Sequence, residues 1–276
     1  MIVGLWLAAA FVGIAGTINE PVVNMYSRAT IDADVVSQAI YGVQVRYLER
    51  QPGWVKVQTP DNYSGWMEAS RTKDTEYASS GKTAWVSSLF AHLYREPSVT
   101  KHQPVLSLPF ETKLEIVAEP AENGKRWLQV RLVDDRRAWV QRGDLSFETK
   151  KLTVEQVIEL SKGFIGLPYT WGGTSSFGYD CSGFTQMLCR RQGIVLPRDA
   201  GPQAEWEGVS PVERGQLRTG DLLYFGSSLQ KITHTGFYIG DGQFIHAAVS
   251  GRPAVQISKL DDQPWTKLYV AARRPK

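Results

Sequence analysis

Two tryptophan-led segments with the same internal spacing constrain the fold of this chain more than any other sequence feature. The first runs from Trp54 to Trp66 and the second from Trp127 to Trp139, so the two tryptophans are twelve residues apart in both. Each segment begins with alternating apolar residues, Trp-Val-Lys-Val in one and Trp-Leu-Gln-Val in the other, which is the period-two pattern of a half-buried β-strand. Repetition of this kind indicates two copies of one small module.

The residues around the first tryptophan pair are expected to form short strands and turns. Alternating apolar residues predict three strands, at 22–26, 43–47 and 54–58. Pro52-Gly53 supplies turn residues between two of them, and no long amphipathic helix is present in this part of the sequence. The pattern therefore predicts a small β-barrel or β-sandwich.

Both copies resemble bacterial SH3-like domains, whose signature is a Trp-x-x-Val…Gly-Trp hairpin. The resemblance implies two small all-β SH3-like barrels, at residues 18–75 and 83–147. Polar stretches at 72–82 and 148–151 are expected to be linkers. A fold of this kind does not by itself indicate a function.

The overall composition is that of an ordinary globular protein. The chain has 276 residues, of which 42% are hydrophobic and 21% charged, and this length suits two or three small domains. The net charge of +3 is too small to indicate a nucleic-acid partner, and no block of like charge stands out. We therefore expect no nucleic acid among the partners of this protein.

An uncharged apolar segment opens the chain. Residues 1–17 contain no charged side chain and are too short to span a bilayer comfortably, so no stable membrane span is expected. Gly13-Ile14-Ala15 offers a small-x-small cleavage site, which favours a secretory signal segment, although Lys and Arg are missing from its start. A truncated start or a buried first strand is the alternative. A signal segment would place the protein in the cell envelope, periplasmic or secreted; without one, it would be cytoplasmic.

A glycine-rich stretch that turns into a helix carries the chemistry of the C-terminal half. Small residues dominate 168–180, and an apolar-periodic run begins at Phe184. Asp180 stands at the expected N-cap, and Cys181 falls in the first helical turn. The helix dipole and free N–H groups there favour a thiolate, so Cys181 is predicted to be a nucleophile that ionises easily. The alternative is a small core thiol.

The second cysteine, Cys189, is predicted to be a core residue. If the segment is helical, it lies eight residues after Cys181, about 12 Å along the axis, whereas a disulfide needs Cα atoms within about 7 Å. No second pair of Cys or His stands at zinc-ligand spacing. No disulfide, metal ion or cofactor is therefore expected.

The C-terminal region, residues 151–276, is predicted to contain helices first and an antiparallel sheet after them. Residues 153–164 are amphipathic, with Thr153 as the N-cap and Gly166 as the stop. A tight turn is expected at Asp241-Gly242. Four strands are expected at 220–225, 234–240, 243–248 and 255–257. This order predicts an α+β fold.

Two histidines, His234 and His246, fall in predicted strands on either side of that turn, so they can lie on neighbouring strands. A cysteine at a helix start, a histidine on a facing strand and a third polar group on the next strand form the triad of a cysteine peptidase. His234 would act as general base for Cys181, and His246 would hydrogen-bond the other ring nitrogen of His234. Either histidine alone is more often a core residue, but the three residues together favour the peptidase.

Three ordered motifs resemble those of the NlpC-type cysteine peptidases. They are Asp180-Cys-Ser-Gly-Phe184, His234-x-Gly-x-Tyr-Ile-Gly240 and Phe244-Ile-His-Ala247. The resemblance covers about residues 151–276 and implies a papain-like fold and cleavage of bacterial cell-wall peptides. It assigns catalysis to Cys181, His234 and His246, and it puts Tyr169 near the oxyanion site. The backbone N–H of Cys181 would be the second donor at that site.

The order of two SH3-like domains before a peptidase domain, together with the run Leu196-Pro-Arg-Asp-Ala200, resembles the γ-D-glutamyl-L-diamino acid endopeptidases, also called dipeptidyl-peptidases VI. These enzymes cleave after L-Ala-γ-D-Glu in murein peptides whose L-Ala amine is free. By analogy, Asp180 and Ser182 would bind that amine. A carboxylate in a closed pocket suits an ammonium group, and an acylated nitrogen would leave it unpaired at a high cost.

In such enzymes the first SH3-like domain also lines the pocket, with an acidic residue and a tyrosine, for which Asp34 and Tyr63 are the candidates here. Asp34 could instead be a solvated loop residue and Tyr63 a turn residue. Trp171, within Pro-Tyr-Thr-Trp-Gly-Gly, is a further candidate for substrate binding. Arg198 and Asp199 either pair with each other or border the cleft.

The sequence thus predicts a multidomain protein: two small all-β SH3-like barrels followed by an α+β papain-like cysteine peptidase domain. The predicted reaction is hydrolysis of the γ-D-glutamyl-L-diamino acid bond of murein peptides with a free N-terminal L-Ala, by a protein for which a monomer is favoured. One alternative is an endopeptidase of intact peptidoglycan with the SH3-like domains as wall anchors. The others are a catalytically inactive wall-binding protein and acyl transfer by the same triad.

Overall fold

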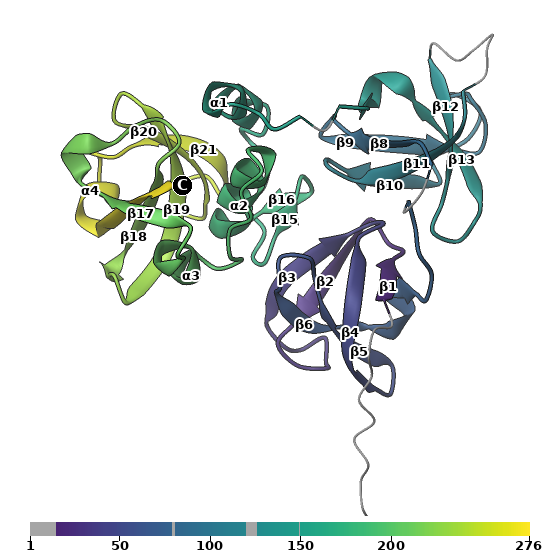
Figure 1. The fold of residues 1–276 in the computed structure, drawn as a ribbon, viewed down its shortest axis with the longest axis horizontal. Coiled ribbons are helices and arrows are strands. Elements are labelled where there is room, and N and C mark those ends of the chain that lie inside the picture. Colours follow the sequence, from purple (N-terminus) through teal and green to yellow (C-terminus); the bar gives the residue numbers. More distant parts are fainter. Residues whose placement is uncertain (1–14, 79–80, 120–125, 149) are drawn as a thin grey trace, which may run out of the picture.

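The computed structural model describes residues 15–78, 81–119, 126–148 and 150–276 (Figure 1). Within these ranges the chain forms three large antiparallel sheets, and its α-helices all follow residue 150. Most of the predicted signal segment, residues 1–14, lies outside the described residues, so that expectation stays a prediction. The last part of the segment belongs to strand β1 (Ala15–Ile18), which pairs with β4 and β7 of the first sheet.

The first module contains strands β1 to β7, in the order β3-β2-β6-β5-β4-β1-β7. The strands after β1 are β2 (Val22–Tyr26), β3 (Val35–Ile40), β4 (Gln44–Gln51), β5 (Trp54–Gln58), β6 (Ser64–Glu68) and β7 (Thr72–Lys73). The predicted strands at 22–26 and 54–58 are confirmed, and the one expected at 43–47 begins one residue later and runs longer, as β4. Alternating residues along these strands bury one face around Met25 and Met67.

The second module repeats this arrangement with strands β8 to β14, in the order β10-β9-β13-β12-β11-β8-β14. The strands are β8 (Thr83–Val86), β9 (Phe90–Tyr94), β10 (Leu106–Pro109), β11 (Lys113–Ala118), β12 (Trp127–Arg131), β13 (Arg137–Gln141) and β14 (Leu145–Ser146). Every strand occupies the place of the strand seven numbers lower in the first sheet. A 3₁₀ turn precedes the last strand in both modules. The shared topology supports the duplication indicated by the tryptophan spacing.

The C-terminal unit, residues 151–276, combines four helices with a six-stranded sheet in the order β17-β22-β18-β19-β20-β21. The helices are α1 (Val154–Lys162), α2 (Cys181–Arg191), α3 (Ala200–Glu205) and α4 (Trp265–Leu268). The strands of the sheet are β17 (Val209–Val212), β18 (Leu222–Ser228), β19 (Lys231–Gly240), β20 (Gln243–Ala248), β21 (Ala254–Lys259) and β22 (Tyr269–Pro275). A small hairpin of β15 (Thr174–Ser175) and β16 (Gly178–Tyr179) precedes α2.

The boundaries of these elements agree with local sequence signals. Thr153 caps α1 in a capping box with Gln156, as a Thr followed three residues later by Gln predicts. The helix ends earlier than predicted, with Gly163 rather than Gly166 at its C-terminus. Both residues of the Asp241-Gly242 turn have positive φ, which a two-residue hairpin requires. The strands β18 to β21 were predicted from the sequence, whereas β17 and β22, which extend the sheet beyond β18, were not.

Apolar side chains cover both faces of the six-stranded sheet. On one face, Phe184 and Leu188 of α2 pack against Phe237 of β19. Cys189 is fully buried in this cluster and is a free thiol, which confirms its prediction as a core residue. On the other face, Phe225 packs with Trp265 of α4, with ring centroids 5.2 Å apart. The sheet is therefore fixed between two cores, and side chains on its central strands have rigid surroundings.

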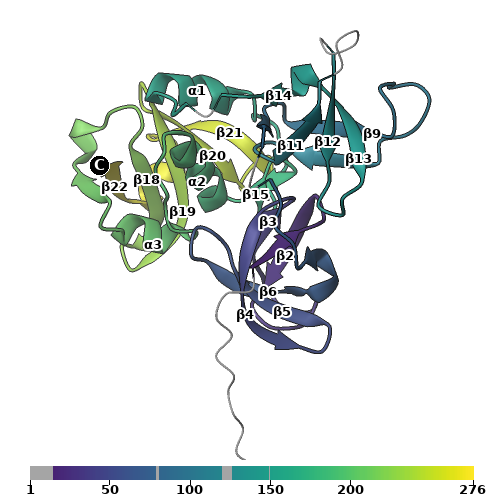
Figure 2. The same cartoon turned by 45° about the vertical axis from the view of Figure 1, so that its right-hand side comes forward.

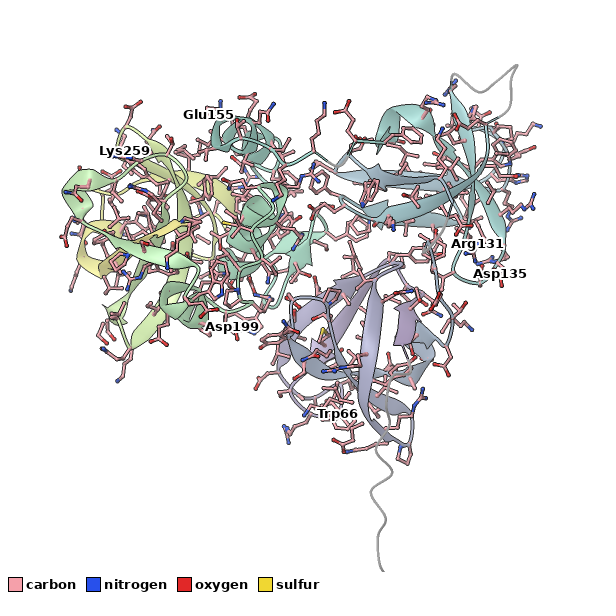
Figure 3. All side chains as sticks on the ribbon, in the orientation of Figure 1. Trp66, Arg131, Asp135, Glu155, Asp199 and Lys259 are labelled. Carbon is pink, nitrogen blue, oxygen red and sulfur yellow. The ribbon has the colours of Figure 1, made fainter. Side chains whose placement is uncertain are left out.

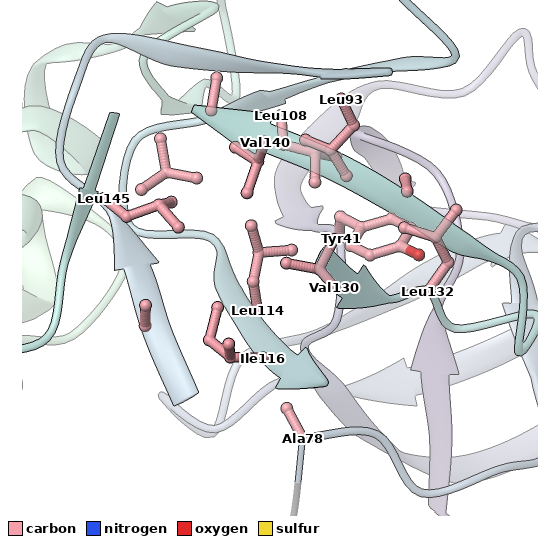
Figure 4. Close-up of a cluster of buried hydrophobic side chains, with 14 of the residues drawn as sticks. Tyr41, Ala78, Leu93, Leu108, Leu114, Ile116, Val130, Leu132, Val140 and Leu145 are labelled. Carbon is pink, nitrogen blue, oxygen red and sulfur yellow. The ribbon is translucent and has the colours of Figure 1, made fainter. Parts of the chain in front are cut away.

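The two modules share a core at their junction (Figure 4). Tyr41 belongs to the first module, yet its ring packs in the apolar cluster of the second, and its hydroxyl accepts a hydrogen bond from the Val133 N–H at 2.7 Å. Tyr77 and Ala78 are also buried there. The prediction of a polar linker at 72–82 is therefore wrong for these residues, because their side chains pack into the second module instead of being solvated.

The second module is anchored on the C-terminal unit in the same way. Phe110 lies in the core around α2, with its ring centroid 5.3 Å from that of Phe164. Full burial of such a ring stabilises the junction by about 1.5–3 kcal/mol. Glu111, next in the chain, accepts hydrogen bonds from Arg190 of α2. Figure 2 shows β15 beside β3 of the first module, so both modules contact the segment around α2.

Candidate active site

Cys181 is the first residue of α2, and the glycine-rich loop before it packs closely against the start of this helix. Asp180 is the N-cap, with an extended backbone, and its Oδ1 accepts a hydrogen bond from the Gly183 N–H at 2.7 Å. A Cβ atom at Gly183 would overlap the carbonyl oxygen of Gly173, so the glycine-rich loop can pack against the helix start only without side chains there. The predicted N-cap and the position of Cys181 at the first helical residue are confirmed.

His234 and His246 lie on adjacent strands, β19 and β20, with their side chains on one face of the sheet. The Nε2 atom of His234 is 2.7 Å from Nδ1 of His246. Gly236, two residues after His234 on β19, leaves room for Phe244 on this face, because a Cβ atom at that position would overlap the Phe244 ring. The indole of Trp265 stacks on His234 with ring centroids 5.0 Å apart, which shields the histidine pair from solvent.

The thiol of Cys181 reaches the strand that carries His234. Pairing between β19 and β20 stops at Phe237↔Ile245, so the N–H of Thr235 has no ladder partner on that side. This N–H donates to the Cys181 sulfur instead. Since Nε2 of His234 is occupied by His246, Nδ1 is the ring nitrogen of His234 that is left for another partner.

Burial controls the protonation of this cluster. It raises the pKa of the Cys181 thiol to about 12, and the charge of Asp180 adds to this effect. It lowers the pKa of His234 to about 3, and it also holds the pKa of His246 well below the usual range. The prediction of an easily ionised thiol is therefore wrong for this state, because loss of hydration outweighs the helix N-terminus. Burial thus favours the uncharged forms of the thiol and of both imidazoles.

Asp180 forms a buried ion pair with Arg198. The Arg198 side chain is 1% exposed, and its Nη2 donates to Oδ2 of Asp180 at 2.6 Å. The same guanidinium donates to Ser182 Oγ at 2.8 Å and to Ser37 Oγ, in β3 of the first module, at 3.1 Å. The carboxylate of Asp180 is thus neutralised by Arg198, and the network ties the nucleophile segment to the first module.

Tyr63 and Asp199 form the neighbouring polar pair. Burial raises the pKa of Tyr63 to about 12, and its hydrogen bond to Asp199 adds to this effect. Although the Asp199 side chain is exposed at the surface, partial desolvation raises its pKa as well. Figure 3 shows Asp199 on the side of the C-terminal unit that faces the first module. Asp199 therefore carries an accessible carboxylate beside a tyrosine of another module.

The remaining candidates surround the same loop. Tyr169 is half-buried, and burial together with the nearby Cys181 raises its pKa. Trp171 is 71% exposed. The next residue, Gly172, has a φ of 75°, and a Cβ atom there would lie 2.7 Å from a methyl carbon of Val35 in β3. The exposed Asp34, which precedes β3, is thus brought near the Trp171 segment.

Further contacts hold the first module against this loop. Thr174 donates its backbone N–H to Gln38 Oε1 at 3.3 Å. Gln186 of α2 donates to Asp61 Oδ2 at 3.0 Å. The sequence analysis did not foresee these partners or Ser37, because nothing in a linear sequence relates residue 37 to residue 198. Arg198 and Asp199 were expected either to pair with each other or to border the cleft, and in the structure Arg198 donates to Asp180, Ser182 and Ser37 while Asp199 lies beside Tyr63.

Neither a metal site nor a membrane-spanning helix is found in the part of the chain that the structure describes. Among those residues, no group of three or more His, Cys, Asp or Glu side chains could hold a metal ion. In the same ranges, no helix is long and apolar enough to cross a membrane.

Comparison with known proteins identifies the family. The NlpC/P60 family profile matches residues 166–274, and the bacterial SH3 domain profile matches residues 21–73. Gamma-D-glutamyl-L-lysine dipeptidyl-peptidase of Bacillus cereus is 35% identical over 256 residues, which cover 86% of this chain and 74% of that protein. The protein of the same name from Bacillus subtilis is 32% identical over 253 residues, which cover 88% of this chain and 82% of that protein. This chain belongs to the NlpC/P60 family.

A solved structure supports the same assignment along the chain. The crystal structure of an NlpC/P60 family protein from Bacillus cereus superposes with a TM-score of 0.79, at 26% identity, over 95% of this chain and 99% of that chain. The similarity thus extends through the modules that precede the NlpC/P60 domain. As a member of this family, the chain is a hydrolase of peptide bonds with a cysteine nucleophile.

Proposed function

We propose that this enzyme hydrolyses the γ-D-glutamyl-L-diamino acid bond of murein peptides whose N-terminal L-Ala is free. Two relatives that match most of the chain are named gamma-D-glutamyl-L-lysine dipeptidyl-peptidases. The observation that carries the proposal is the Tyr63–Asp199 pair, in which a side chain of the first module meets a carboxylate eighteen residues after Cys181. Asp199 is close enough to Asp180, which precedes Cys181, for their charges to interact, and an accessible carboxylate there suits the ammonium group of a short peptide.

In the proposed reaction, Cys181 Sγ attacks the γ-carbonyl carbon of D-Glu while Nδ1 of His234 takes the thiol proton. The tetrahedral oxyanion is stabilised by the Cys181 N–H and the Tyr169 hydroxyl. The C–N bond then breaks, the diamino acid leaves with the proton from His234, and a thioester remains. Water attacks the thioester, His234 takes and returns one proton, and free L-Ala-γ-D-Glu and the thiol are regenerated. His246 holds the ring of His234 throughout.

We propose that the carboxylate of Asp199, which lies beside Tyr63, binds the free amine of the substrate. The sequence suggested Asp180 and Ser182, but Arg198 already donates to both side chains. A carboxylate paired with a buried guanidinium offers little further attraction to an ammonium group. In this proposal Asp180 and Ser182 hold Arg198 in place. Trp171 and Asp34 remain candidates for contacts with the peptide at the edge of the site.

The test uses two peptides, free L-Ala-γ-D-Glu-L-Lys and the same peptide acetylated on L-Ala. We expect cleavage of the free peptide only, and none by Cys181→Ala. Asp199→Asn should lose the preference for the free amine, whereas the matched Asp34→Asn should keep it. Equal cleavage of both peptides by the wild-type enzyme would refute the amine site. Loss of the preference in Asp34→Asn alone would move the amine to Asp34.

The second candidate is cleavage of intact peptidoglycan, with the modules as wall anchors. A row of aromatic rings on the second module favours it: Phe90, His92 and Tyr94 follow one face of β9, with centroids 5.1 and 6.3 Å apart, and Phe90 is 46% exposed. Of these rings Phe90 is exposed, His92 half-buried and Tyr94 buried, so Phe90 is the ring that could stack on a wall polymer. Release of peptides from purified sacculi, where L-Ala is acylated, would support this candidate against the first. A catalytically inactive wall-binding protein or an acyl transferase would leave both test peptides unhydrolysed.

The architecture we propose is that of two SH3-like barrels and a papain-like peptidase domain, at residues 18–75, 83–147 and 151–276. The match of the bacterial SH3 profile to the first module and the identical strand order of the second support it. We further propose that the enzyme acts in the cell envelope as a monomer. The murein peptide substrate is the reason for this location, and a signal at residues 1–17 would provide the export.

A further inference from the structure

The hydrogen-bond chain of the site extends beyond His246. Its Nδ1 contacts His234, and its Nε2 lies 3.0 Å from the Oγ of Ser258, on the outer strand β21. Ser258 sits two residues from Gln256, which pairs directly with His246, so the hydroxyl reaches the imidazole diagonally across the strands. His246 is fully buried, while Ser258 is half-buried. Ser258 therefore supplies the hydrogen bond to the nitrogen of His246 that does not contact His234.

We propose that Ser258 is a positioning residue that holds His246 in the tautomer with its proton on Nε2. This inference rests on the proposed mechanism, in which His234 takes the proton of Cys181. It does not depend on which peptide is the substrate. Ser258 touches neither the substrate nor the reacting atoms, and it acts through His246.

The chemistry requires one tautomer of His246. When His234 takes the thiol proton on Nδ1, it becomes an imidazolium whose Nε2 also carries a proton. That N–H can be stabilised only if Nδ1 of His246 has a free lone pair, and then the single proton of His246 is on Nε2. In the other tautomer two N–H groups would face each other across 2.7 Å. An acceptor at Nε2 of His246 therefore favours the productive state.

The surroundings of Ser258 suit an acceptor. The residue lines a pocket of about 340 Å³ between β21 and the segment that leads into α4. The other lining residues are Gln243, Ile257, Lys259, Asp262, Gln263 and Trp265. Water fits a polar pocket of this size, so the Ser258 proton can point to solvent while an oxygen lone pair accepts from His246. Figure 3 shows Lys259 at the outer surface of the C-terminal unit, which agrees with an opening to solvent.

The ring of Trp265 and the pocket have different roles around the histidine pair. Trp265 covers the histidines, with its ring centroid 5.0 Å from that of His234 and 4.8 Å from that of His246. His246 is thereby kept from solvent, and the hydroxyl connects it to the pocket. The charged residues that line the same pocket are Lys259 and Asp262, and the titratable group that contacts the hydroxyl is His246, which in turn contacts His234.

The first test is the pH dependence of kcat and KM for Ser258→Ala, with Ser258→Thr as the conservative variant. We expect kcat of Ser258→Ala to fall about tenfold, as loss of one hydrogen bond to the transition state would give, with KM unchanged. The acid limb of kcat/KM should move to lower pH, because the imidazolium of His234 loses support. Ser258→Thr keeps the hydroxyl and should restore both values.

Gln256→Ala is the matched control. Gln256 lies on the same strand and opposite His246, but its amide donates to the backbone carbonyls of Ser250 and Arg252. Its loss should leave kcat and the acid limb unchanged. An unchanged profile in Ser258→Ala, or equal losses in Ser258→Ala and Gln256→Ala, would overturn the proposal.

A second measurement needs no substrate. Nitrogen-15 spectra of histidine-labelled protein report which ring nitrogen of His246 carries the proton. We expect a protonated Nε2 in the wild type and in Ser258→Thr, and a shift towards protonated Nδ1 in Ser258→Ala. A wild type protonated on Nδ1 would refute the inference even if the enzyme is active. If the γ-glutamyl peptide is not cleaved but the tautomer shifts as expected, the proposed substrate fails and the role of Ser258 stands.

Discussion

Replacing Arg198 tests the network that joins the first module to the nucleophile helix. Arg198 is buried, and its guanidinium donates to Asp180, Ser182 and Ser37. Arg198→Met keeps much of the apolar stem but leaves the Asp180 carboxylate buried without its partner. Removing one partner of a buried ion pair typically costs about 3–5 kcal/mol, whereas the intact pair adds little net stability. We therefore expect a loss of about 3–5 kcal/mol in the free energy of unfolding.

The assay is equilibrium unfolding in urea, followed by tryptophan fluorescence, for the variant and for a control. Arg136→Met is the control, because Arg136 forms an exposed pair with Asp134 at 2.7 Å. Exposed pairs of this kind contribute about 0–1 kcal/mol, so its loss should be hard to detect. The double variant Arg198→Met, Asp180→Asn should recover part of the lost stability, since it removes the unpaired charge.

Two results would refute this reasoning. A cost below about 1 kcal/mol for Arg198→Met would mean that water reaches Asp180 and that the pair behaves like a surface contact. A double variant no more stable than Arg198→Met would mean that the loss comes from packing and not from the unpaired carboxylate. Activity would add a separate observation, because Asp180 also caps the helix that carries Cys181.

Three further predictions follow from the same geometry. Burial lowers the pKa of His234 to about 3, from an ordinary value of 6.5, so the acid limb of kcat/KM should lie below pH 6.5. For the same reason the free energy of unfolding should decline as pH falls from 6.5 towards 3. An acid limb at or above pH 6.5 would contradict this. Tyr41→Phe should weaken the junction of the modules by about 1–3 kcal/mol, measured by urea unfolding, because a buried N–H loses its acceptor; an unchanged midpoint would show that water replaces the hydroxyl. Gly183→Ala should cost about 1–3 kcal/mol or more and abolish peptide cleavage, because its Cβ would overlap Gly173; normal activity would mean that the loop can shift.

Local sequence signals predicted the features that depend on neighbouring residues. The Thr153 N-cap, the Asp180 N-cap and the Asp241-Gly242 turn each rest on contacts within a few residues, and the structure has all three. The duplicated strand order could likewise be anticipated, because each copy repeats the same tryptophan spacing. Even the proximity of His234 and His246 followed from one short hairpin, whose two strands must pair.

Features that depend on burial and on distant segments were not predictable in this way. The helix N-terminus suggested an easily ionised thiol, yet burial by surrounding elements raises the pKa of Cys181. Tyr77 looks like part of a polar linker, but its environment is the core of the second module. Ser258 carries no motif, and only the alignment of β20 with β21 puts its hydroxyl on His246.

The sequence by itself determined the position of Cys181 at a helix start, its helix cap, the pairing of the strands that carry the two histidines and the repetition of the N-terminal modules, because these follow from periodicity and from contacts between near neighbours. Only the tertiary structure decided which charges are free. Arg198 neutralises Asp180 and leaves Asp199 exposed beside Tyr63, and this outcome depends on where the first module packs against the C-terminal unit. The physical reason is that the attraction of a charged side chain for a ligand depends on its ion-pair partners and on its access to water. Tertiary packing sets both, because it brings those partners together from distant parts of the chain.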